Sequence, residues 1–256
     1  MGEESIGYRD GDTELTGFRA WPDNPGVRPG VVVVHGGAGL DEHARGRARR
    51  VAALGYQAFA CDMYGEGVAG DRERVLSCLH QLLGDRQRLC ARLQAAVDVL
   101  ARDARVDGRI AAIGYCFGGG VVLEAARAGA PLAAVVSVHG RLATDTPARS
   151  GEITAKVLAC HGALDPHVPR EQVNGFIDEM NAAGADWQLD VYGQALHGFT
   201  HEHGPPSPGV AYNAAADARS SIAIAALLAE AFQATPRPSG PAPKQDQQRL
   251  GPRLRP

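Results

Sequence analysis

The sequence of 256 residues has no apolar run approaching the length, about 18 residues, that a membrane-spanning helix needs. It begins with an acidic, polar segment, Met1 to Ser5, which lacks the basic start and apolar core of a secretory signal. Its cysteines, at positions 61, 78, 90, 116 and 160, form no C-x-x-C pair, which argues against a disulfide framework and a structural zinc site. These absences predict a cytoplasmic protein without membrane association.

A large excess of charge of one sign is also missing, since the formal net charge is -3. Such a chain has no broad basic surface, so we expect no nucleic-acid partner. The composition, 45% hydrophobic and 21% charged, is typical of a globular protein. The expected partner is a small molecule, and the chain is expected to act as a monomer or a homodimer.

Short apolar strands alternate with helical segments along most of the chain. Val31 to Val34 is a β-branched run bounded by glycines, which is typical of a parallel strand buried on both faces. Asp10-Gly11 predicts a hairpin of edge strands before it. Further strands are expected at 57–61, 109–113, 133–138, 156–160 and 187–192, and helices at 42–54, 86–102, 117–128, 168–183 and 213–232. The alternation predicts an α/β fold of three α/β/α layers, with a doubly wound, mostly parallel sheet.

The length of the chain suits one domain, which we place at residues 1–234. No internal repeat divides it. The remaining segment, 235–256, is rich in proline and lacks an apolar pattern, so we expect a disordered C-terminal tail.

A glycine-rich turn follows the strand expected at 109–113 and precedes a helix. It reads Gly114-Tyr115-Cys116-Phe117-Gly118-Gly119, the G-x-nucleophile-x-G pattern of a strand-to-helix elbow. Glycine at both flanks lets the turn tighten, and the N-terminal end of the helix favours the thiolate form of Cys116. Cys116 is therefore the candidate nucleophile. Its alternative role is a small buried hydrophobic residue.

A thiol nucleophile needs a base and a carboxylate that orients the base. Asp165 and His197 each follow a predicted strand, so both are expected at the same sheet edge as Cys116, in the chain order nucleophile, acid, histidine. Taken singly, Asp165 has the alternative of a turn or helix-cap carboxylate, and His197 that of an ordinary loop histidine. Together they predict a Cys-Asp-His triad.

Attack on a carbonyl creates an oxyanion, which needs two backbone donors. Phe117, directly after the candidate nucleophile, is expected to supply one. The loop 35–39 is expected to supply the other from Gly37, with His35 anchoring the loop rather than acting as a second base. The loop does not predict a dinucleotide site, because Glu42 stands where the third glycine of G-x-G-x-x-G belongs.

These motifs resemble the dienelactone hydrolase family, whose members have the α/β-hydrolase fold, use a Cys-Asp-His triad and hydrolyse dienelactones in aromatic catabolism. The resemblance spans roughly residues 31–232, and its most specific parts surround Cys116, Asp165 and His197. The segment Cys61-Asp62-Met63-Tyr64-Gly65 is similar too. The resemblance implies no cofactor and no metal. It also implies that Tyr64 lines the substrate pocket, with a simple rim aromatic as the alternative.

Two positions depart from the family pattern. Characterised members carry a glutamate that helps to draw the proton from the thiol; here Gly36 stands in that position at the substrate site, so His197 itself must generate the thiolate. Members also carry an arginine for a substrate carboxylate after the catalytic histidine, where this chain reads Thr200-His201-Glu202-His203. His201 is a candidate substrate contact; a solvated loop histidine and a metal ligand are its alternatives.

The sequence therefore predicts a hydrolase that cleaves a lactone, ester or thioester through an acyl-cysteine intermediate. The absence of the glutamate at Gly36 motivates one alternative, a non-hydrolytic small-molecule binder or redox-responsive thiol protein. Another alternative is an enzyme of natural-product cyclisation or acyl transfer, because one fold serves many reactions.

Overall fold

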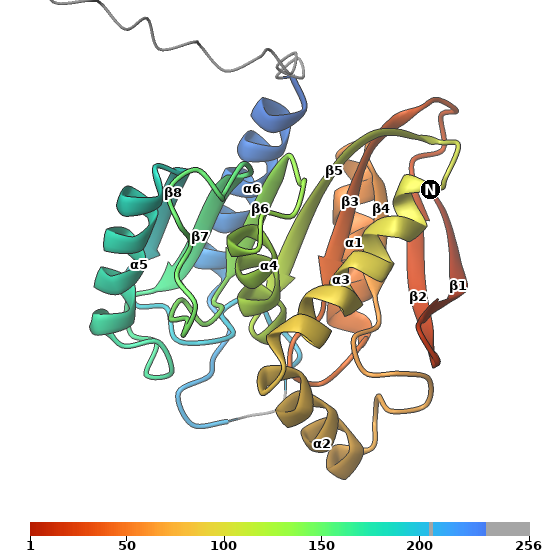
Figure 1. Ribbon diagram of the computed structural model, residues 1–256. Helices are drawn as coiled ribbons and strands as arrows, with labels where there is room; N and C mark the ends of the chain where they lie inside the picture. Colours follow the sequence, from red (N-terminus) through yellow and green to blue (C-terminus); the bar gives the residue numbers. More distant parts are fainter. Residues whose placement is uncertain (205–206, 234–256) are drawn as a thin grey trace, which may run out of the picture.

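Residues 1–204 and 207–233, the part of the chain that the computed structural model describes, form one sheet with helices on both faces (Figure 1). The sheet has eight strands in the order β1-β2-β4-β3-β5-β6-β7-β8. They are β1 (Gly2–Asp10), β2 (Thr13–Trp21), β3 (Arg28–Val34), β4 (Gln57–Cys61), β5 (Val106–Tyr115), β6 (Ala134–Val138), β7 (Lys156–Gly162) and β8 (Asp186–Tyr192). β1 and β2 form the antiparallel edge hairpin, and the pairs from β4 to β8 are parallel, which confirms the predicted sheet.

The helices of the described residues divide between the two faces of the sheet. They are α1 (Glu42–Ala53), α2 (Arg72–Leu83), α3 (Arg86–Ala101), α4 (Phe117–Arg127), α5 (Arg170–Ala183) and α6 (Ala214–Gln233). Successive residues of a strand point to opposite faces. Accordingly, Val31 and Val33 belong to the apolar cluster that contains α1 and α6, whereas Val32 and Val34 belong to the one that contains α3, α4 and α5.

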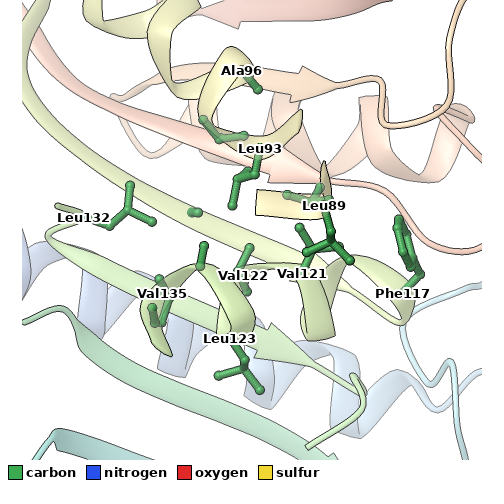
Figure 2. Close-up of a cluster of buried hydrophobic side chains, with 14 of the residues drawn as sticks. Leu89, Leu93, Ala96, Phe117, Val121, Val122, Leu123, Leu132 and Val135 are labelled. Carbon is green, nitrogen blue, oxygen red and sulfur yellow. The ribbon is translucent and has the colours of Figure 1, made fainter. Parts of the chain in front are cut away.

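The apolar cluster that contains Val32 and Val34 also brings α3 and α4 together. Figure 2 shows Leu89 of α3 close to Val121 of α4, and Phe117 at the first turn of α4. These side chains are almost fully buried. Close packing of this kind fixes the position of the turn that precedes α4.

Two helices differ from the expected pattern. α2 is not among the predicted helices; Asp71 caps it by accepting the backbone N–H groups of Glu73 and Arg74. The other difference is the start of α5 at Arg170 rather than at residue 168. Pro169 is the N-cap of α5 and has extended backbone angles, which delays the helix.

Within residues 1–204 and 207–233, no helix is long and apolar enough to cross a membrane. The segment 235–256, predicted to be a disordered tail, lies outside the described residues. The single domain at 1–234 stays a prediction.

Candidate active site

Cys116 lies in the turn between β5 and α4, where the parallel strands end. Its backbone has φ 52° and ψ -113°, a conformation that residues with side chains rarely adopt. The turn is tight on both sides, because a Cβ on Gly114 would collide with the backbone of Gly118, and a Cβ on Gly118 would lie 2.5 Å from the carbonyl oxygen of Val34. Glycine is therefore required on each side of Cys116 for a steric reason.

Three side chains from separate loops make a continuous line of contacts at this edge. His197 Nε2 lies 3.1 Å from Cys116 Sγ, and His197 Nδ1 lies 2.8 Å from Asp165 Oδ2. The other carboxylate oxygen of Asp165 accepts the backbone N–H of His167 at 2.8 Å. The structure thus brings together the three residues singled out in the sequence. With its Nδ1 proton donated to Asp165, His197 can exchange a proton with the sulfur through Nε2.

Opposing pKa shifts favour charge separation between Cys116 and His197. Burial raises the pKa of the Cys116 thiol, but the hydrogen bond and charge of His197 outweigh it and lower that pKa below its ordinary value. Burial lowers the pKa of His197, yet the contacts with Asp165 and Cys116 raise it to about 10. The pKa of Asp165 is lowered, because its hydrogen bond with His197 and that residue's charge outweigh burial. The arrangement stabilises a thiolate beside an imidazolium.

Backbone donors from two elements point toward the sulfur. Hydrogen bonds from the backbone of Gly37 and Phe117 contribute to the lowered pKa of Cys116. The loop that carries Gly37 is held by buried His35, whose Nδ1–H donates to the Gly36 carbonyl at 2.6 Å and whose Nε2 accepts the N–H of Met63 at 3.1 Å. The anchoring role predicted for His35 is confirmed. Gly37 and Phe117 thus direct backbone N–H groups toward the sulfur, and their role as oxyanion donors stays a prediction.

A cavity of about 740 Å³ opens beside Cys116, within the range of roughly 300 to 1,000 Å³ common for small-molecule sites. Cys116, His197, Gly37 and Phe117 all border it. The rest of its wall comes from α2, α3, α4, the loop after β6 and the start of α5. The candidate nucleophile, base and oxyanion donors therefore face one space large enough for an organic substrate.

Tyr64 and Gly36 do not border this cavity in the described part of the chain. Tyr64 is almost fully buried, and its hydroxyl donates to the Gly37 carbonyl at 3.1 Å. This contact supports the loop that carries Gly37. Lining of the substrate pocket by Tyr64 stays a prediction. Gly36 lies beside the nucleophile, since a Cβ added to it would be 3.6 Å from the Cβ of Cys116. Contact of Gly36 with substrate stays a prediction.

His201 also lies outside the described lining of the cavity. Its ring stacks on that of His43, with ring centroids 3.6 Å apart, and burial lowers its pKa. Across residues 1–204 and 207–233, no group of three or more His, Cys, Asp or Glu side chains is placed to hold a metal ion. Contact of His201 with substrate stays a prediction.

A chain of buried hydrogen bonds behind the elbow is not indicated by the sequence motifs. His139 Nδ1 accepts the backbone N–H of Cys116 at 3.1 Å, so its Nε2–H donates to Thr200 Oγ1 at 2.8 Å. The Thr200 hydroxyl in turn donates to His43 Nε2 at 3.0 Å, and Arg47 Nε donates to the same nitrogen at 3.2 Å. Burial and the neighbouring histidines hold the pKa of His139 well below its ordinary value, which keeps it a neutral acceptor. The available signal was a histidine directly after the strand at 134–138.

A buried ion pair connects this series of hydrogen bonds to α1 and α6. Arg47 Nη1 lies 2.6 Å from Asp217 Oδ1, and both side chains are buried. The second amino group of Arg47 donates to the carbonyl of Thr200 at 2.6 Å. Thr200 is three residues after His197, so this pair holds the loop that carries the candidate base.

The chain is similar to proteins that are named as dienelactone hydrolases or their relatives. The model of the dienelactone hydrolase family matches residues 15–232. A putative carboxymethylenebutenolidase of Escherichia coli K12 is 30% identical over 204 residues, which cover 75% of this chain and 75% of that protein. The crystal structure of a dienelactone hydrolase-like promiscuous phosphotriesterase from metagenomic libraries is 42% identical, with a TM-score of 0.84 over 90% of this chain and 98% of that one.

A more distant structure supports the fold assignment. An alpha/beta hydrolase enzyme from a deep-sea metagenome library superposes with a TM-score of 0.58 over 91% of this chain and 99% of that one. Its sequence is 15% identical, so the likeness is one of fold. The predicted α/β-hydrolase fold is confirmed.

Proposed function

Because the chain belongs to the dienelactone hydrolase family and is a hydrolase of ester or lactone bonds, we propose that it acts through an acyl-cysteine intermediate on Cys116. The observation that carries the proposal is the unbroken line from Asp165 through His197 to the sulfur, with contacts of 2.8 and 3.1 Å. Such a line supplies a nucleophile, a base and an orienting carboxylate. Hydrolysis is favoured over the binder alternative by family membership.

In the first half of the reaction, the Cys116 thiolate attacks the carbonyl carbon and forms a C–S bond, while the carbonyl π electrons move to oxygen. The N–H groups of Gly37 and Phe117 stabilise the resulting negative charge. The C–O bond to the leaving group then breaks, and the Nε2 proton of His197 passes to the leaving oxygen. The products are a thioester on Cys116 and an alcohol, which stays attached to the acyl group when the substrate is a lactone.

In the second half, the neutral His197 takes a proton from a water molecule whose oxygen attacks the thioester carbonyl. The tetrahedral species collapses by breaking the C–S bond, and the sulfur leaves as a thiolate. The carboxylic acid departs, and the pair of thiolate and imidazolium is restored. Asp165 keeps His197 in one tautomer and stabilises its positive charge throughout.

Phosphotriester hydrolysis is a second candidate reaction. It is motivated by the 42% identical relative, whose name describes a promiscuous phosphotriesterase. A p-nitrophenyl phosphotriester assayed beside the carboxylic esters tests it. Release of p-nitrophenol that is lost in Cys116→Ala supports the reaction at this site, and no release above the rate without enzyme contradicts it.

The proposed function is tested by steady-state hydrolysis of p-nitrophenyl butyrate with wild type, Cys116→Ala and Cys90→Ala. Cys90 lies on α3 and is partly buried, so Cys90→Ala controls for loss of a thiol elsewhere. We expect Cys116→Ala to lose at least about 10³-fold in kcat/KM. Cys90→Ala should stay close to wild type. Equal rates for wild type and Cys116→Ala would remove the assigned nucleophile.

A further inference from the structure

One side of the cavity at the nucleophile is a wall of apolar side chains. It is made by Leu79, Leu82, Leu83, Leu89 and Val121. The leucines come from α2 and the first turn of α3, and Val121 comes from α4. Leu83 is 50% exposed, so an apolar side chain at the end of α2 borders the open cavity. An apolar surface next to polar reacting groups is typical of a site that binds an apolar part of a ligand.

The charged side chains on this side of the cavity are paired with one another. Arg86 Nε lies 2.5 Å from Glu124 Oε2, and Arg127 Nη1 lies 3.0 Å from Glu124 Oε1. Arg127 Nη2 also lies 2.7 Å from Glu179 Oε2, so the charges of two arginines and two glutamates compensate each other locally. Arg141, which also borders the cavity, comes from the loop after β6, across α4 from α3. The leucine side thus suits an uncharged group.

The position of His197 indicates which part of the substrate meets the leucines. The leaving oxygen must lie near His197 Nε2, which protonates it. His167, whose ring centroid is 5.0 Å from that of His197, borders the cavity on the same side. The leucine wall belongs to α2 and α3. α3 packs against β1, β3, β4 and β5, whereas the loops of Asp165 and His197 follow β7 and β8 at the other end of the sheet. The acyl group therefore extends toward the leucines.

Building on the proposed function, we propose that the substrates are esters or lactones whose acyl part is an uncharged apolar chain or ring of about four to eight carbon atoms, bound against the leucines of α2 and α3. Each methylene buried there raises kcat/KM by up to about fourfold, because the gain from its burial is kept in the transition state. Acetyl esters leave the wall uncovered and are poorer substrates.

The test compares kcat/KM for p-nitrophenyl acetate, butyrate and hexanoate in wild type, Leu83→Asn and Leu76→Asn. Leu83 and Leu76 lie on the same helix and are 50% and 43% exposed, but Leu76 does not border the cavity. We expect hexanoate to exceed acetate by about tenfold or more in wild type and in Leu76→Asn. In Leu83→Asn this ratio should fall by at least about threefold.

Three outcomes overturn the proposal: a rate that is flat or falls with chain length, an equal ratio in the two variants, or faster hydrolysis of the p-nitrophenyl monoester of glutaric acid than of the pentanoate of equal length. The last result would mean that the site selects a carboxylate. Failure of the proposed function looks different, because hydrolysis would then persist in Cys116→Ala whatever the acyl chain.

Discussion

The backbone of Cys116 is in a conformation that costs about 1–3 kcal/mol and persists because its surroundings determine it. Its N–H donates to the carbonyl of Val138 at 3.0 Å and to His139 Nδ1 at 3.1 Å, which holds the turn from behind. The strained turn sets the sulfur at the N-terminal end of α4 and within reach of His197. Strain at this residue thus accompanies the placement of the sulfur beside the imidazole of His197.

Glycines near the elbow differ in how much space surrounds them. In Gly118→Ala the new Cβ would lie 2.5 Å from the Val34 carbonyl oxygen, so we expect a loss of roughly 3 kcal/mol or more in the free energy of unfolding. In Gly36→Ala, the matched control, the nearest contact is 3.6 Å and the fold should be kept. Urea denaturation of the two variants measures the difference, and equal midpoints would contradict it.

The pH dependence of thiol reactivity reports on the contact between Cys116 and His197. Replacing His197 by Gln removes the charge that lowers the pKa of Cys116, and burial, which raises that pKa, then dominates. The thiolate fraction at pH 7 should therefore fall, and iodoacetamide should label Cys116 more slowly, with the inflection of the pH–rate curve moved upward. Mass-spectrometric labelling rates from pH 5 to 10 give this curve. An unchanged inflection would show that His197 does not control the thiol.

At the scale of the elements, regular local signals made most strands and helices predictable. β3 is a run of valines buried on both faces, and α3 carries leucines at helical spacing. α2 lacks such a signal, because among its residues Val75 and Leu82 alone are buried. Leu79 and Leu83, which border the cavity beside Leu82, are partly exposed. Because part of its apolar face borders a cavity rather than the core, a search for core periodicity passes over α2.

The Thr200 hydroxyl connects the loop after β8 to His139, which follows β6, and to His43 of α1. In Thr200→Val the buried Nε2–H of His139 loses its acceptor, which costs about 1–3 kcal/mol of stability. Because His139 also accepts the N–H of Cys116, we expect slower iodoacetamide labelling of Cys116 and a lower kcat. Thr200→Ser keeps the hydroxyl and should restore both. A positioning role is contradicted if Thr200→Val lowers the urea midpoint but leaves labelling and kcat unchanged.

At the scale of the whole molecule, the site depends on contacts between parts of the chain that are far apart in sequence. Arg47 of α1 and Asp217 of α6 meet behind the loop that carries His197. The triad was foreseeable because its members follow strand ends in a known chain order. The buried network was not, since nothing local in the sequence says that residues 47, 139, 200 and 217 meet. The orientation of Tyr64 depends in the same way on tertiary packing.

Asp217→Asn tests the long-range tie between α1 and α6. The change leaves the buried Arg47 without its opposite charge, which should cost roughly 3–5 kcal/mol in the free energy of unfolding. Asp98→Asn is the control, because it removes the exposed pair with Arg102 and should cost below about 1 kcal/mol. Chemical denaturation of both variants gives the two values. Similar losses would show that the buried pair has no special part in holding the fold.

The central claim, that hydrolysis passes through an acyl group on the sulfur of Cys116, is tested most directly by rapid acid quench during turnover of p-nitrophenyl butyrate, followed by intact-mass and peptide mass spectrometry. The account predicts a transient mass increase of one butyryl group on the peptide that contains Cys116, and its absence in Cys116→Ala. Turnover without an adduct on that peptide at any quench time, or an adduct on another residue that disappears as product forms, would contradict it.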